Sequence, residues 1–133
     1  MLRVDVMPGS PAAQAGLRGP LRLHTLDGKA VVDDLDYRFF AAGELLTAGI
    51  EDGRGRRRVV IRKTYDADPG FVLPPLRPRV CGNNCVFCFV SQHPPNVRAA
   101  LRLRDEDYRL SFLLGNYVTL TNLTVADWRR IAR

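Results

Sequence analysis

The chain has 133 residues, of which 46% are hydrophobic and 26% are charged, and its formal net charge is +6. This length fits one domain, or one small domain and part of another, and the composition excludes a wholly disordered, collagen-like or low-complexity chain. No apolar run is long enough to span a membrane, and the charged residues Arg3 and Asp5 argue against a secretory signal peptide. We therefore expect a cytoplasmic protein whose three cysteines are reduced thiols or metal ligands.

The charge is uneven along the chain. Residues 1–70 carry eleven basic and ten acidic side chains, a balance of +1, whereas residues 71–133 carry nine and four, a balance of +5. A basic half can indicate an anionic partner, but the arginines are scattered and no basic stripe with interleaved aromatic residues occurs. The sequence therefore does not indicate nucleic-acid binding.

The first 67 residues contain short apolar segments separated by strong turn signals. Residues 2–6 alternate apolar and polar side chains as a half-buried strand does, and Ser10 can cap a short helix over residues 11–15. Residues 22–26 predict a second strand, which ends at the turn Asp27-Gly28.

A longer helix and a hairpin follow. Residues 33–42 predict a helix with Leu35, Phe39 and Ala42 on one face, and we expect it to pack on the sheet through Leu35 and Phe39. Apolar residues alternate on both sides of the Asp-Gly-Arg-Gly sequence at residues 52–55, which predicts a β-hairpin.

This order of elements resembles a PDZ domain entered partway through. The resemblance rests on residues 6–17 and 26–31, and it implies an α+β, PDZ-like domain over residues 1–67. Pro20-Leu21 replaces the usual Gly-Asp, and the family's carboxylate-binding loop is missing upstream, where residues 70–73 could supply a substitute. PDZ domains bind peptide ends by adding a strand to a sheet edge, so the resemblance implies a peptide or protein partner.

All three cysteines lie within eight residues, as Cys81, Cys85 and Cys88, with the spacing Cys-x-x-x-Cys-x-x-Cys. Soft thiolates suit iron–sulfur clusters and zinc, and so short a loop can wrap a cuboidal cluster. Three thiolates would leave one iron of a four-iron cluster free of protein ligands. That iron could bind a small molecule.

Two other interpretations remain open at this point. In the first, His93 completes a structural zinc site with the three cysteines, and the protein is a PDZ-like adaptor. In the second, the chain is an electron-transfer protein that holds a cluster, which a fourth cysteine would favour. The sequence has three cysteines, so that fourth ligand is absent.

The cysteine spacing, with Phe87 just before the third cysteine, resembles the signature of radical SAM enzymes. The match extends over residues 85–92, 105–112 and 115–122, and it resembles a subfamily with an N-terminal PDZ-like domain and a C-terminal domain of unknown function. The resemblance implies a [4Fe–4S] cluster on Cys81, Cys85 and Cys88. It also implies S-adenosylmethionine on the fourth iron, Phe87 near the adenine, and a one-electron reductant.

The remaining residues predict the opening of a β/α barrel. Residues 68–80 are expected to form a linker and the first barrel strand, and residues 81–133 the cluster-binding N-terminal part of the barrel. Within that part, residues 97–104 predict a helix, residues 117–121 a strand, and Thr124 caps a helix whose Trp128 and Ile131 should pack inward.

The end of the predicted second strand supplies a candidate ligand contact. Barrel active sites lie at the C-terminal ends of the strands, which makes Thr121 and Asn122 the expected second contact with S-adenosylmethionine. A complete barrel needs about 200 residues or more. We therefore expect the chain to be the N-terminal part of a longer protein and to be inactive alone, with a substrate that the sequence does not identify.

Overall fold

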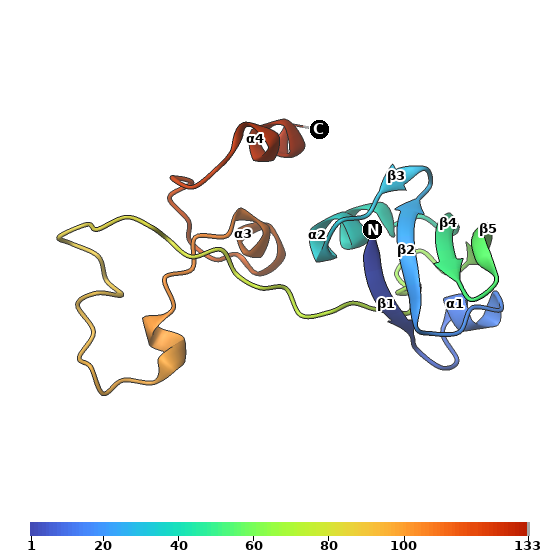
Figure 1. Cartoon of the computed structure of the whole chain (residues 1–133), viewed down its shortest axis with the longest axis horizontal. Helices are drawn as coiled ribbons and strands as arrows, with labels where there is room; N and C mark the ends of the chain where they lie inside the picture. The colour runs from blue at the N-terminus through green and yellow to red at the C-terminus, as the bar shows by residue number, and fades with distance from the viewer. Residues whose placement is uncertain (133) are drawn as a thin grey trace. The chain divides into compact units, whose positions relative to one another are not determined.

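The computed structural model describes residues 1–132, which divide into two compact units, one covering Met1–Leu76 and the other beginning at Arg77. The first unit is a mixed α/β domain built on an antiparallel sheet (Figure 1), and the second contains short helices joined by long irregular segments. No helix in the described part of the chain is long and apolar enough to cross a membrane.

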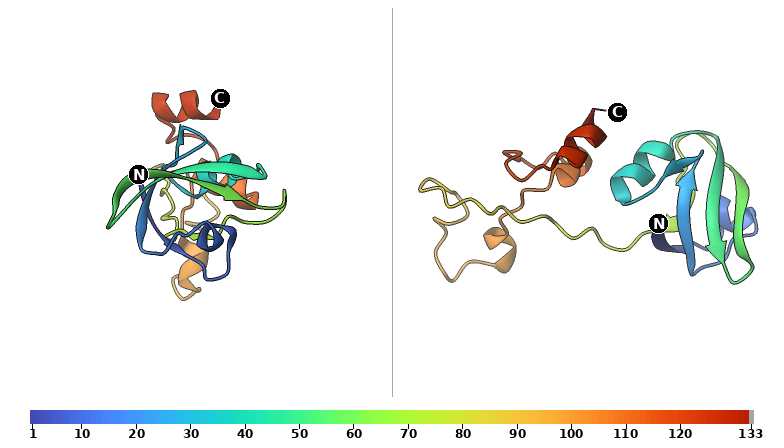
Figure 2. Two further views of the ribbon diagram at one scale, coloured as in Figure 1. Left: turned by 90° about the vertical axis from the view of Figure 1, so that its right-hand side faces the viewer. Right: turned by 45° about the horizontal axis from the view of Figure 1, so that its top comes forward.

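The sheet of the first unit has the strand order β5-β4-β2-β1-β6, with β3 paired to β2. All neighbouring strands are antiparallel and lie side by side as a twisted layer (Figure 2). The strands are β1 (Leu2–Val6), β2 (Leu21–Leu26), β3 (Lys29–Ala30), β4 (Leu45–Asp52), β5 (Gly55–Arg62) and β6 (Phe71–Val72). The β2, β4 and β5 segments confirm the predicted second strand and hairpin.

Turn chemistry explains two of these connections. Asp27 and Gly28, between β2 and β3, have φ angles of 48° and 79°, which both central residues of a type I′ hairpin turn require. Asp52 pairs with Gly55 across the β4–β5 hairpin, so Gly53 and Arg54 form a two-residue loop.

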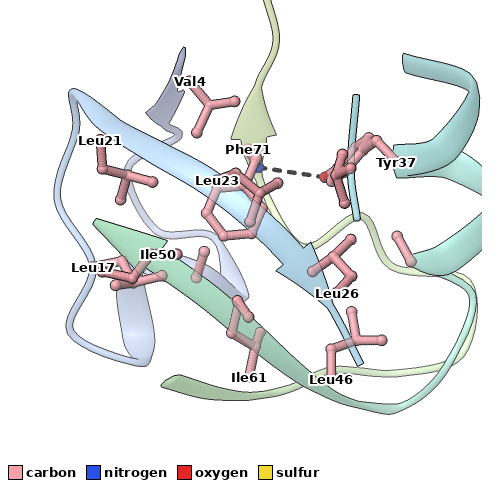
Figure 3. Close-up of a cluster of buried hydrophobic side chains, with 14 residues drawn as sticks. Val4, Leu17, Leu21, Leu23, Leu26, Tyr37, Leu46, Ile50, Ile61 and Phe71 are labelled. Carbon is pink, nitrogen blue, oxygen red and sulfur yellow. Dashed lines mark hydrogen bonds between the residues drawn. The ribbon is translucent and has the colours of Figure 1, made fainter. Parts of the chain in front are cut away.

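The core of the first unit lies on one face of the sheet (Figure 3). In β2 the buried residues are Leu21, Leu23 and Leu26 rather than an unbroken alternation, because the register with β4 shifts between Leu23 and Thr25. A bulge of this kind moves the following side chains to the other face. Buried residues from the other elements complete the core: Val4, Ala12, Leu17, Val31, Tyr37, Ala41, Leu46, Ala48, Ile50, Ile61 and Phe71.

Two capped helices accompany the sheet. Helix α1 (Pro11–Gln14) begins after Ser10, whose side chain accepts a hydrogen bond from the Ala13 amide, as the sequence predicts. Helix α2 (Asp34–Phe40) begins after Asp33, which caps the Asp36 amide, and it is shorter than the predicted helix over residues 33–42.

The predicted buried face of α2 is wrong. Phe39 is 72% exposed, and the buried residues are Tyr37, 3% exposed, and Ala41. The Tyr37 ring packs edge-on against Phe71, with a centroid separation of 6.3 Å. Its hydroxyl donates to Asp68 Oδ1 at 2.7 Å and accepts from the Phe71 amide at 3.4 Å. A tyrosine can be buried at low cost when its hydroxyl finds such partners, and Phe39 has no comparable pocket.

Residues 68–72, expected to open the linker, are part of the first unit. Strand β6 pairs with β1 through Asp5↔Val72 and Val6↔Phe71. The Gly70 carbonyl accepts a hydrogen bond from the Met7 amide at 2.9 Å.

Burial and the bond to Asp68 raise the pKa of Tyr37 far above its ordinary value, so its hydroxyl stays protonated and donates to Asp68.

The second unit contains η1 (Ala99–Arg102), a single 3₁₀ segment, and the helices α3 (Tyr108–Leu114) and α4 (Val125–Ile131). The capping box between Thr124 and Asp127 at the start of α4 is confirmed. The predicted helix over residues 97–104 is reduced to η1, and α3, capped by Asp107 and closed by Gly115, was not predicted.

The expected barrel strands do not form in residues 77–132. Val80 makes one isolated bridge with Asp105, and residues 117–121 are irregular because Leu120 adopts a positive φ of 61°, which interrupts an extended strand. Trp128 is 52% exposed rather than packed inward, and Ile131 is partly buried.

A polar network holds the second unit together. Tyr108 is the one fully buried hydrophobic residue in its described part, and three acidic residues, Glu106, Asp107 and Asp127, are buried with it. Arg79 makes a two-pronged ion pair with Asp127, at 2.7 and 2.8 Å, and lies over the Tyr108 ring. Burial by itself would raise the pKa of Asp107, but hydrogen bonds from Arg109 and from the Arg79 amide hold that pKa below its ordinary value.

Candidate metal centre

The three cysteines lie on one irregular segment, residues 81–91, here called the cysteine loop, which runs through the yellow part of Figure 1. Cys81 and Cys88 are half-buried and Cys85 is exposed. The loop has turns but no helix or strand, as expected of a segment rich in glycine and asparagine. All three thiols are therefore within reach of a metal species from solvent.

A short stretch of paired backbone anchors the start of the cysteine loop. The Cys81 amide donates to the Arg104 carbonyl at 2.8 Å, and the Glu106 amide donates to the Arg79 carbonyl at 3.0 Å. Between these two bonds lies the bridge from Val80 to Asp105. The first cysteine is thus fixed against residues 104–106, although the sequences that pair are more than twenty residues apart.

The side chain of Arg104 contacts the cysteine loop at two further points. Its Nη1 donates to the Asn83 carbonyl at 3.1 Å, and its Nη2 donates to the Ser91 hydroxyl. Sequence reasoning misses this role, because the sequence predicts that Arg104 belongs to a helix over residues 97–104. Arg104 lies two residues after the end of η1, and the spacing of the residues around it does not predict a contact with residues 83 and 91.

The second and third cysteines share a turn. The Cys88 amide donates to the Cys85 carbonyl at 3.2 Å, and the Gln92 amide donates to the Cys88 carbonyl at 3.1 Å. Hydrogen bonding from Ser91 lowers the pKa of the Cys88 thiol from its usual value, and the positive charge of Arg104 acts in the same direction. A lowered thiol pKa favours the thiolate, which is the form that binds metals.

Thr121, one of the two expected contacts with S-adenosylmethionine, lies beside the cysteine loop. Its Oγ1 accepts a hydrogen bond from Asn83 Nδ2 at 2.7 Å. The buried carboxylate of Glu106 holds the preceding segment by accepting from both the amide and the hydroxyl of Thr119, each at 2.7 Å. The structure therefore brings Thr121 next to the loop without the strand that was expected to place it.

Asn122 carries an unsatisfied acceptor. Its Oδ1 is buried and has no hydrogen-bond partner among residues 1–132. Buried polar atoms nearly always have a partner, so the orphaned acceptor of Asn122, the residue after Thr121, is a candidate to accept from a bound molecule. Phe87 is 73% exposed and is free to stack on a planar group.

The donor set fits a thiolate-bound metal species in kind and number. Three thiols on one accessible loop match the preference of iron–sulfur clusters and zinc for soft ligands. Among residues 1–132, however, no three His, Cys, Asp or Glu side chains are gathered into a group that could hold a metal ion as they stand. His93, the fourth ligand of the alternative zinc site, is exposed, and its amide donates to the Val90 carbonyl at 3.4 Å.

Comparison with known proteins agrees with this reading of the region. A family model described as a radical SAM-like domain matches residues 63–133, which is 71 of the 133 residues. No curated protein matches the chain. The matched region contains the cysteine loop, Arg104, Glu106 and residues 119–122, and the chain belongs to the radical SAM-like domain family.

Proposed function

We propose that this chain is an iron–sulfur protein of the radical SAM type, with a [4Fe–4S] cluster held by Cys81, Cys85 and Cys88. One observation carries the proposal: within the region that matches the family, three thiols share a single accessible loop whose start is pinned to residues 104–106. Three protein thiolates suit a cluster with one iron available to a small molecule.

The cluster would supply the chemistry, and the chain would supply placement. When bound and reduced by an external one-electron donor, such a cluster provides the electron that cleaves the sulfonium of S-adenosylmethionine. The residues of the chain have separate tasks. Ser91 favours the Cys88 thiolate, and Asn83 ties the loop to Thr121.

The binding of S-adenosylmethionine is assigned to three side chains. Thr121 has a hydroxyl beside the loop, Asn122 has an unsatisfied buried acceptor, and Phe87 offers an exposed aromatic face to the adenine. In this proposal Asn122 Oδ1 accepts from the ligand, because none of the described residues donates to it. The substrate of the radical chemistry is not assigned.

The test is anaerobic reconstitution of the full chain with iron and sulfide. We expect about four irons and four sulfides per chain, with the broad visible absorption of a thiolate-bound cluster. Replacing Cys81, Cys85 or Cys88 with Ser should each remove the cluster, whereas His93→Ala should leave it in place. Stoichiometric zinc that needs His93, with no iron uptake, would instead establish the adaptor with a structural zinc site.

A peptide partner at the first unit is a second proposal. A hollow of about 380 Å³ lies between α2 and residues 68–76 and is lined in part by Tyr37, Phe71 and Leu73. Strand β6 has two residues and lies at the edge of the sheet, where an added peptide strand could pair. Titration with a labelled peptide of hydrophobic C-terminal sequence tests it, and binding should be weakened by a substitution that fills the hollow, such as Leu73→Trp.

A further inference from the structure

Two separated parts of the cysteine loop meet at one side chain. Asn83 lies between the first and second cysteines, and Ser91 lies three residues after the third. Arg104 donates to the carbonyl of the first and to the hydroxyl of the second, and its own carbonyl accepts from the Cys81 amide. These contacts link residues 83 and 91 of an otherwise irregular segment.

We infer that Arg104 is a positioning residue that ties Asn83 to Ser91 and so limits the conformations from which the cysteine loop gathers its thiols on a cluster. The purpose assigned to Arg104 rests on the proposed function, whereas its contacts with residues 83 and 91 do not. A loop that must bring three thiols to one cluster loses conformational entropy when it does so. A side chain that already ties residue 83 to residue 91 removes part of that loss before the metal arrives, which is the general advantage of preorganisation.

The chemistry of arginine suits this task. The guanidinium is planar and presents several N–H donors in a fixed fork, so one side chain can donate to two acceptors at once. It is always charged, which strengthens both hydrogen bonds. A lysine at this position could contact either acceptor but could not span both in the same geometry.

The network around Arg104 continues to the second candidate contact. Asn83, whose carbonyl accepts from Arg104, uses its side-chain amide to donate to Thr121. Because one residue carries both bonds, a change at Arg104 is expected to loosen the Thr121 contact as well as the loop. The side chain of Arg104 donates to Asn83 and Ser91, so in this proposal it acts on the cysteines through other residues.

The experiment compares four variants with the wild-type chain: Arg104→Met, Arg104→Lys, Ser91→Ala and, as the matched control, Arg102→Met. Arg102 lies two residues earlier, and its guanidinium donates to the Pro95 carbonyl, outside the cysteine loop. The control removes the same charge from the same stretch of chain. All four substitutions leave the backbone bond from Cys81 to residue 104 available.

The first readout needs no metal. Chymotrypsin is added to the metal-free chain, and cleavage after Phe87 and Phe89, both exposed, is followed by mass spectrometry. We expect cleavage about fivefold faster in Arg104→Met than in the wild type, a smaller increase in Arg104→Lys and Ser91→Ala, and no change in Arg102→Met, because local opening governs such cleavage. Equal rates in Arg104→Met and Arg102→Met would overturn the inference.

The second readout is the rate at which the reconstituted chain loses iron to a chelator. We expect a loss about tenfold faster in Arg104→Met, since two charge-assisted hydrogen bonds are removed, and a rate close to wild type in Arg102→Met. A wild-type chain that takes up no cluster refutes the proposed function, while the cleavage result still decides the role of Arg104. A wild-type chain that holds its cluster no better than Arg104→Met refutes the inference alone.

Discussion

Asp127→Asn should strongly destabilise the second unit, because it weakens a buried ion pair. Asp127 accepts two hydrogen bonds from Arg79, and the same carboxylate accepts from the amide and hydroxyl of Thr124. The Asp127 side chain is 8% exposed and that of Arg79 is 34% exposed. Breaking a fully buried ion pair costs about 3–5 kcal/mol and an exposed one about 0–1, so we expect a loss of about 2–3 kcal/mol here.

The assay is urea unfolding followed by tryptophan fluorescence. The single tryptophan, Trp128, is the neighbour of Asp127 on α4, so the signal reports on the second unit. Arg129→Met, an exposed change on the same helix, is the control and should shift the free energy of unfolding by about 0.5 kcal/mol or less. An Asp127→Asn loss no larger than that of the control would show that the Arg79 pair does not hold the unit together.

The same substitution has a defined pH dependence. Hydrogen bonding from Arg79 lowers the pKa of Asp127 far below its ordinary value. A carboxyl whose folded pKa is lowered contributes stability that is complete above the unfolded pKa, about 3.9, and is lost as the pH falls towards the folded value. The difference in unfolding free energy between wild type and Asp127→Asn should therefore be constant from pH 6 to 8, by this argument, and smaller at pH 3. A difference that grows on acidification would contradict the assigned pairing.

Two further predictions concern the first unit, each measured as a shift in the chemical unfolding midpoint. Tyr37→Ala should lower the free energy of unfolding by about 3–5 kcal/mol, because it removes a buried ring. Phe39→Ala should lower it by less than about 1 kcal/mol, because that ring is exposed. The reverse order would indicate that Phe39, and not Tyr37, lies on the buried face of α2. Gly70→Ala should be severely destabilising, since Gly70 has a φ of +94° and an added Cβ would lie 2.1 Å from Ser10 Cβ. Gly53→Ala, where an added Cβ meets nothing within 4 Å, should be close to neutral, and equal effects at the two glycines would refute this account of the β1–β6 junction.

The first unit was largely predictable because its local signals agree with its packing. Alternation in β1 and β4, the Ser10 cap and the Asp27-Gly28 turn each specify a structure within a few residues. The face of α2 was not predictable from spacing alone. It depends on the hydrogen bond from Tyr37 to Asp68, 31 residues away, which lets a polar aromatic residue be buried.

The second unit was less predictable from the sequence than the first. The cysteine spacing identified the candidate ligands, but the segment that looked like a strand at residues 117–121 is held by side chains, chiefly Glu106 on Thr119. The contacts of Arg104 depend on the path of the irregular cysteine loop up to residue 91, and no periodic pattern in the sequence predicts that path. Helix α3 did carry a readable signal, since Asp107 caps it and Gly115 ends it with a φ of 75°.

The most direct test of the central claim is electron paramagnetic resonance of the anaerobically reconstituted and reduced chain, recorded with and without S-adenosylmethionine. If Cys81, Cys85 and Cys88 are the protein ligands of a [4Fe–4S] cluster, one iron is open to the added molecule, and its spectrum should change on addition. Thr121→Ala and Asn122→Ala should weaken that change without removing the cluster. A reduced cluster whose spectrum is the same with and without saturating S-adenosylmethionine would contradict the account.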